Sequence, residues 1–133
     1  MGAMTLFDLA QRGMSAQMVR INAAASNLAN AGSVSATADG AYRPIRPVFA
    51  EQFDRATGLS SVDVASVQRS TAAPVKQYNP GHPLADSEGN VWEAPVDESA
   101  EMVEMLDASR QYQNLVEALS TAKQLMLETM RMK

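Results

Sequence analysis

The placement of proline constrains the fold of this chain more than any other feature. All six prolines and five of the seven glycines lie between residues 32 and 96. Proline breaks helices and glycine weakens them, so the long segments on either side are free to be helical. We therefore divide the chain into an N-terminal helix within residues 1–31, a middle region of loops and short strands at residues 32–96, and a C-terminal helix within residues 97–133. The predicted fold class is mainly α with a small β region, and its long terminal helices are paired as a coiled-coil-like layer.

Apolar residues recur at heptad spacing in both terminal segments. The N-terminal series has one polar member, Gln17, and consists of Phe7, Ala10, Met14, Gln17, Ile21, Ala24, Leu28 and Ala31. The C-terminal series is interrupted by Ser109 and Lys123, and consists of Met102, Met105, Ser109, Tyr112, Val116, Leu119, Lys123, Met126 and Met130. A 3.5-residue repeat favours left-handed pairing of two helices. The polar interruptions either specify the pairing or are substitutions that an exposed helix tolerates.

Capping residues mark where the two helices begin and end. Thr5, with Asp8 three residues later, predicts a capping box at the first helix. Asn30 and Gly32 suit the C-terminal boundary of this helix. The acidic run at residues 97–104 matches the positive end of the second helix dipole, and we interpret it as a solvated face.

Turn residues divide the middle region into short extended pieces. Turns are expected at residues 39–40, 57–58 and 88–90, where glycine follows a polar residue. Residues 42–49 must be extended but cannot form a central strand, because they contain two prolines. Residues 61–67 alternate and then lose register, which predicts a short strand with a bulge. Further strands are predicted at residues 74–78 and 90–92, with Trp92 in the core of this region.

The terminal helices are too long to bury their apolar faces in a small β region. They must pack on each other, and a helix pair still leaves apolar surface on its outer sides. We expect this second face to be formed by the apolar residues off the heptad series, which are Ala23, Ala25, Leu115, Leu125 and Leu127. Exposed apolar area of this kind calls for partner chains. The nine methionines suit adaptable contact surfaces, or they simply fill the helices.

Composition argues against several function classes. The net charge is −4 and the basic residues never cluster, so no nucleic-acid partner is expected. The chain has no cysteine, phosphate-binding glycine loop or catalytic motif, so we expect no enzyme activity, no cofactor and no small-molecule substrate. His82 is the only histidine, which favours a rigid loop contact over a metal site. Nothing resembles a secretory signal or an apolar span of about 18 residues.

Three segments carry a resemblance to a known family. The N-terminal segment contains Ser15-Ala16-Gln17 and then residues 22–31, Asn-Ala-Ala-Ala-Ser-Asn-Leu-Ala-Asn-Ala. It resembles the N-terminal signature of bacterial flagellar rod and hook axial proteins. Residues 78–86, Tyr-Asn-Pro-Gly-His-Pro-Leu-Ala-Asp, and the tail around residues 101–114 are similar to a short member from the proximal rod. The resemblance implies a structural subunit of the drive shaft that transmits torque from motor to hook.

The resemblance also implies partners and a location. The partners are other rod proteins, copies of this chain, the base of the rod at the membrane ring and, in transit, the flagellar type III export apparatus. The location is the periplasmic rod of the flagellar basal body, reached without a cleaved signal peptide. The alternatives are another short axial rod subunit of the same family and a membrane-surface amphipathic helical protein.

Three groups of residues are candidates for contact with neighbours. The group on the N-terminal helix comprises Phe7, Met14, Gln17, Ile21, Ala24, Asn27, Leu28 and Asn30. The group on the C-terminal helix comprises Met102, Met105, Tyr112, Val116, Leu119, Met126 and Met130. A docking loop comprises Pro80, Gly81, His82 and Pro83. Asn27 either sets register across an interface or helps to end the helix, whereas Asn30 is interpreted as a cap.

Overall fold

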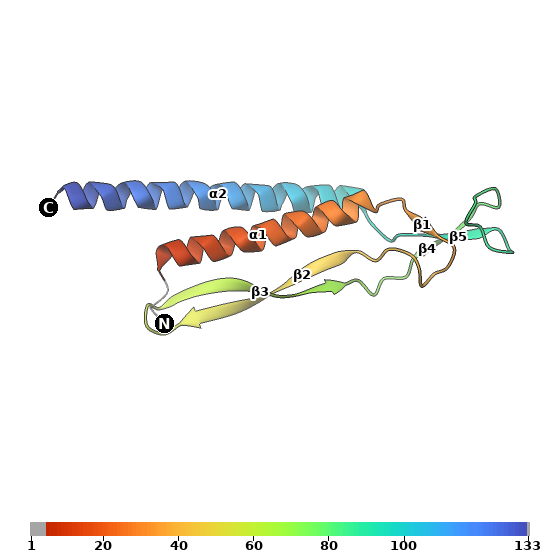
Figure 1. Cartoon of the computed structure of the whole chain (residues 1–133), viewed down its shortest axis with the longest axis horizontal. Coiled ribbons are helices and arrows are strands. Elements are labelled where there is room, and N and C mark those ends of the chain that lie inside the picture. Colours follow the sequence, from red (N-terminus) through yellow and green to blue (C-terminus); the bar gives the residue numbers. More distant parts are fainter. Residues whose placement is uncertain (1–4, 133) are drawn as a thin grey trace.

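The computed structural model describes residues 5–132 of the chain. Its main elements are two long helices, α1 (Leu6–Ala29) and α2 (Glu98–Arg131), which pack side by side. All the strands lie between them in sequence. The predicted fold class, long paired terminal helices with small β sheets in the middle, is confirmed. The molecule is elongated, and α2 continues past the start of α1 at one end (Figure 1).

The first helix begins at the capping residue predicted from sequence, and the second begins at the start of the predicted acidic run. The Thr5 hydroxyl accepts the Asp8 N–H at 3.1 Å, and the Asp8 carboxylate accepts the Thr5 N–H at 3.1 Å, so the capping box is confirmed. At the other end of α1, the Asn30 side chain and its backbone N–H both donate to the Ser26 carbonyl, at 2.9 and 3.1 Å. The Asp97 carboxylate accepts the Ala100 N–H at 3.2 Å at the start of α2.

Small side chains bring the elements close to α1. Its buried residues are alanines and one asparagine: Ala10, Ala16, Ala23, Ala24 and Asn27. Gly13 lies against Leu115 of α2, whose nearest side-chain carbon would be 3.0 Å from a Cβ added at this glycine. The absence of a side chain at Gly13 therefore makes room for Leu115 between the helices.

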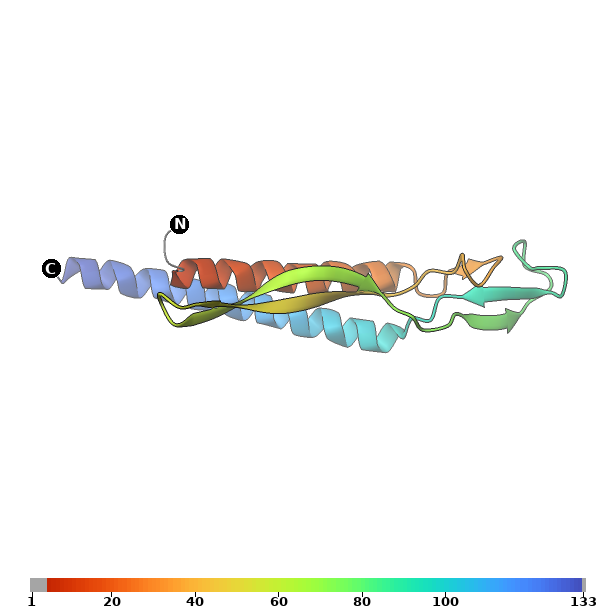
Figure 2. The ribbon, with the colours of Figure 1, turned by 90° about the horizontal axis from the view of Figure 1, so that it is seen from below.

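A β hairpin runs along α1 and is the main departure from the sequence prediction. It comprises β2 (Ile45–Asp54) and β3 (Leu59–Arg69), and α1 lies between this hairpin and α2 (Figures 1 and 2). The prediction of a short strand at residues 61–67 underestimated β3. Val48 pairs with Ser66 and Phe49 with Val64, which leaves an extra residue in β3. This bulge reverses the alternation midway along the strand, so the sequence pattern hides its full length.

A second, three-stranded sheet lies at the end of the molecule away from the start of α1 and the end of α2 (Figure 1). Its order is β1 (Val34–Ser35), β5 (Asn90–Glu93) and β4 (Val75–Tyr78), with antiparallel pairing throughout. The β4 and β5 strands were predicted, whereas β1 was not, because two residues are too few to display an alternation. The central strand buries Val91, while Trp92, the residue predicted for the core, is half-buried.

Candidate assembly surfaces

The side of α2 that packs on α1 is rotated from the predicted heptad series. Ala108 is fully buried, and Leu115 packs on Gly13. Leu115 also lines a groove between the helices together with Leu119 and Ala122. The expectation that Leu115 and Ala23 form an outer face is therefore wrong, since both face inward. The error arose because alanines and a glutamate occupy much of the α2 face that is covered. The adjacent face of α2 is more apolar, and it therefore gave the stronger heptad pattern.

The candidate contact residues of α2 fall into two groups. Exposed on the surface are Met102, Val116, Met126 and Met130. Met105, Tyr112 and Leu119 are half-buried at the margin of the helix pair. Apolar side chains that are exposed in the isolated chain can contact another chain. The exposed group is therefore the one available to neighbouring subunits.

The candidate contact residues of α1 are largely covered by the chain itself. Ala24 and Asn27 have no exposed surface. The others are half-buried, and they are Phe7, Met14, Gln17, Ile21, Leu28 and Asn30. This covering comes from α2 and from the hairpin, which the sequence did not place beside α1. The capping interpretation of Asn30 is confirmed by its bond to Ser26.

Arg20 of α1 connects the two helices electrostatically. Its guanidinium donates to Glu104 at 2.8 Å and to Asp107 at 2.8 Å, and also to Gln17 within α1 at 2.8 Å. The hydrogen bond to Glu104 raises the pKa of Arg20 above its ordinary value, although partial burial acts in the opposite direction. Gln17, the polar interruption in the first heptad series, therefore orients a cation at the α1–α2 contact.

Glu101 is a buried carboxylate, contrary to the expectation of a solvated acidic face. Its side chain is 2% exposed, and its Oε2 accepts from the Arg46 Nη1 at 3.0 Å. The second carboxylate oxygen accepts from the Arg46 Nη2. Arg46 belongs to β2, so the start of α2 is attached to the base of the hairpin. The hydrogen bond to Glu101 also raises the pKa of Arg46.

Within residues 5–132, the end of α2 extends past the start of α1 and has no helix beside it (Figure 1). Ala122 is the last α2 residue to line the groove with Leu6, Leu9 and Ala10 of α1, yet α2 continues to Arg131. We call residues 123–131 the α2 extension. Its exposed apolar side chains are Leu125, Met126, Leu127 and Met130, the last of these 68% exposed. At 1.5 Å per residue, the extension adds about 14 Å of helix.

The docking loop is an ordered turn next to the three-stranded sheet. The Asn79 N–H donates to the Gly89 carbonyl at 2.8 Å, and the Leu84 N–H donates to Nδ1 of His82 at 3.0 Å. Gly89 has a φ of +79°, and a Cβ there would lie 3.3 Å from the Cα of Pro80. The turn therefore requires glycine at this position. Pro80, Gly81 and Pro83 are exposed and His82 is half-buried.

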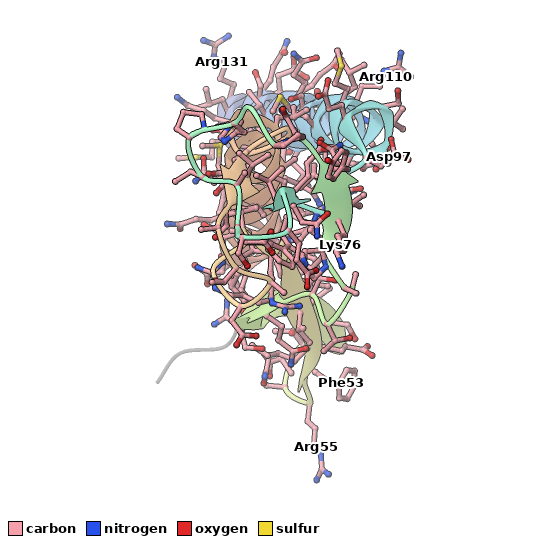
Figure 3. All side chains as sticks on the ribbon, turned by 90° about the vertical axis from the view of Figure 1, so that its right-hand side faces the viewer. Phe53, Arg55, Lys76, Asp97, Arg110 and Arg131 are labelled. Carbon is pink, nitrogen blue, oxygen red and sulfur yellow. The ribbon has the colours of Figure 1, made fainter. Side chains whose placement is uncertain are left out.

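The hairpin tip forms another exposed projection. Phe53 and Arg55 extend away from the helices at the side of the molecule opposite Arg110 and Arg131 (Figure 3). Phe53 is 61% exposed. No group of three His, Asp or Glu within residues 5–132 is arranged to hold a metal ion. No helix in that described part is long and apolar enough to cross a membrane.

Comparison with known proteins identifies the family. A sequence profile described as "Flagellar basal body rod FlgEFG protein C-terminal" matches residues 87–132, which include β5 and α2. The chain is 45% identical to the flagellar basal-body rod protein FlgC of Salmonella typhimurium over 132 residues, covering 98% of this chain and 97% of the relative. The chain belongs to the FlgC family of flagellar basal-body rod proteins.

More distant relatives agree with this assignment. The FlgC protein of Escherichia coli O6:H1 is 42% identical over 130 residues, covering 98% of this chain and 97% of the relative. That of Agrobacterium fabrum is 30% identical over 123 residues, covering 91% of this chain and 88% of the relative. As a member of the FlgC family, the chain is a structural rod subunit and not an enzyme. The resemblance found in the sequence is therefore confirmed, and the family is FlgC and not another short axial subunit.

Several structurally important residues of this FlgC-family chain were not found from sequence. Arg20, Arg46 and Leu115 were either unassigned or placed on another face. Arg46 and Glu101 are 55 positions apart, and Arg20 and Asp107 are 87 apart, so no local pattern reports either pairing. The one usable signal for these pairings was the acidic run at residues 97–104. Carboxylates in such a run can be buried only if cations from elsewhere in the chain pair with them.

Proposed function

We propose that this FlgC-family subunit joins its neighbours in the rod mainly through the α2 extension and the exposed face of α2. The observation that carries the proposal is the run of apolar side chains on a helix end with no helix beside it. Leu125, Met126, Leu127 and Met130 are all exposed there. Isolated helix ends are marginally stable in water, and burying such a surface against another chain stabilises both.

The partners we propose are copies of this chain, other rod subunits and the base of the rod at the membrane ring. Contacts between different surfaces of successive subunits produce a helical polymer when the rotation does not close into a ring. Met102 and Val116 extend the apolar face toward the start of α2, so one subunit can contact more than one neighbour. Torque is then shared over many contacts between motor and hook.

The docking loop supplies a second proposed contact. Pro80, Gly81 and Pro83 are exposed on a turn that the hydrogen bonds of Asn79 and Leu84 hold in place. A preformed turn loses little conformational entropy when it binds. The half-buried His82 uses its Nδ1 to stabilise the turn and presents its remaining surface to a neighbour.

The export route completes the proposal. We propose passage through the flagellar type III apparatus without cleavage of a signal, followed by assembly in the periplasmic space. A chain without cysteine forms no disulfide that would have to be undone before passage. Residues 97–133 depend on partners for part of their stability, which suits a subunit that becomes fully ordered on assembly.

The proposal is tested in a bacterium whose own copy of this protein has been deleted. The variant L125S/L127S/M130S removes the apolar surface of the α2 extension. A matched control, Q124S/E128S, changes exposed polar residues of the same segment. We expect the control to enter purified basal bodies and support swimming, and the triple variant to fold but remain outside the rod. Normal rods built from the triple variant would contradict the proposed contact.

A further inference from the structure

The base of the hairpin is attached to α1 by the side chain of Asn27. This residue has no exposed surface. Its Nδ2 donates to the Ile45 carbonyl at 3.0 Å, and its Oδ1 accepts the Ile45 N–H at 2.9 Å. The same oxygen accepts the Tyr42 hydroxyl at 2.8 Å, and that hydroxyl lies 3.0 Å from the Ser26 hydroxyl. One buried amide thus binds both backbone polar groups of the residue that begins β2.

This arrangement makes Asn27 a substitute for a neighbouring strand. A strand residue that does not bond to its partner strand presents its N–H and C=O on the other side, where another strand would normally bind them. The side chain of an asparagine carries one acceptor and one donor on a rigid planar group. It can therefore satisfy both groups of Ile45 only when β2 approaches α1 in one orientation.

The next residue of β2 is attached to the other helix. Arg46 binds the buried Glu101 of α2 through both guanidinium nitrogens. Consecutive residues at the base of the hairpin are thus held by both helices, and we call Asn27, Ile45, Arg46 and Glu101 the hairpin joint. Ala23 lies four residues before Asn27 on the same side of α1, and its small side chain lets the hairpin approach closely.

Nearer its tip, the hairpin contacts α1 through Arg12 and the buried Ser61, which is 2% exposed. Arg12 of α1 donates to Asp63 at 3.1 Å and to Ser61 at 3.4 Å. The Arg12 and Asp63 side chains are 44% and 40% exposed, so water and salt screen their attraction. The joint differs from this contact because its ion pair is buried on the Glu101 side and attaches the hairpin to α2 as well as to α1.

We propose that Asn27 is a positioning residue that fixes the direction of the hairpin relative to the helix pair. The inference rests on the proposed function, and it adds the hairpin to the surfaces that must fit against neighbouring subunits. A ten-residue strand is about 33 Å long, so an error of about 10° at the joint displaces the tip by about 6 Å. This displacement exceeds the distance between adjacent strands in a sheet. A tip displaced by that much would no longer fit the surface of a neighbouring subunit.

The first experiment measures the direction of the hairpin in the isolated full-length chain. Because the chain has no native cysteine, spin labels can be attached at introduced cysteines without further changes. One pair, Ser60→Cys with Gln113→Cys, reports the distance from hairpin to α2. A second pair, Ser15→Cys with Gln113→Cys, reports the distance from α1 to α2. All three positions are exposed.

The variants separate positioning from general stability. N27A removes the two Asn27 bonds to Ile45 and the one from Tyr42, and it leaves the Arg46 bond to the Ile45 carbonyl in place. Y42F removes the contacts of the phenol hydroxyl with Asn27 and Ser26, and N22A changes an exposed asparagine of the same helix. We expect N27A to broaden the hairpin-to-α2 distance distribution roughly twofold with the α1-to-α2 distribution unchanged. Y42F and N22A should match the parent chain. An unchanged hairpin distribution in N27A, or loss of its helical circular dichroism, would overturn the proposal.

The second experiment asks whether the direction of the hairpin matters for the rod. In the deletion strain, we expect N27A to enter basal bodies about tenfold less than N22A, because it loses three buried hydrogen bonds at the joint. Normal entry of N27A despite a broadened hairpin would refute the role in fitting and leave the proposed function intact. Failure of the parent chain itself to enter rods would instead refute the proposed function.

Discussion

The pair of Arg46 and Glu101 allows a quantitative prediction about stability. Glu101 is 2% exposed, whereas the Arg46 side chain is 49% exposed. In the variant R46M, the carboxylate remains buried without its cation, while the methionine keeps most of the apolar contact. Removing one partner of a fully buried pair destabilises a protein by about 3–5 kcal/mol.

Because water reaches half of Arg46, part of this penalty will be relieved by solvent. We therefore expect R46M to lower the free energy of unfolding by about 2 kcal/mol, which corresponds to about 8 °C in the midpoint of thermal unfolding. Adding E101Q removes the charge that lacks a partner. The double variant R46M/E101Q should recover about 1 kcal/mol of that loss.

The assay is thermal and urea unfolding followed in two signals. Circular dichroism reports the helices, and the fluorescence of Trp92, the single tryptophan, reports the three-stranded sheet. The control is R12M, because Arg12 forms an exposed pair with Asp63 and should contribute less than about 1 kcal/mol. Equal destabilisation by R46M and R12M would refute the reasoning, as would a double variant no more stable than R46M.

Three further predictions follow from the helix contacts and the docking loop. L115A should lower the stability of the isolated chain by about 2–3 kcal/mol in urea unfolding, whereas L125A on the α2 extension should change it by less than about 0.5 kcal/mol. R20M should cost about 1–2 kcal/mol in the same assay, because it removes hydrogen bonds to two carboxylates of α2, and an unchanged midpoint would contradict this. G89A should speed amide hydrogen exchange at residues 79–89 by about tenfold, because a residue with a Cβ is strained in the left-handed conformation of Gly89. The control is G81A, which should leave exchange unchanged because a Cβ at Gly81 would meet no other atom within 4 Å.

The sequence by itself was sufficient for the helices, the turns and the family. Proline and glycine act through local backbone geometry, and so do the capping contacts of Thr5 and Asp97, so their consequences are visible without a tertiary structure. Gly58 and Gly89 adopt a positive φ at predicted turns for the same reason. The segments that resemble axial proteins lie in α1, the docking loop and α2, and full-length identity to FlgC proteins agrees with them.

The tertiary structure alone decided which face of each helix is covered. The hairpin was underestimated because a bulge reverses its alternation, and its position beside α1 depends on pairings between distant residues. The sequence left Asn27 open between a register-setting residue and a helix-end residue, and it predicted a solvated Glu101. Both side chains are buried because Ile45 and Arg46 approach them from the hairpin. Local patterns report the periodicity of a helix, but burial of a polar group depends on a partner that only the folded chain brings within reach.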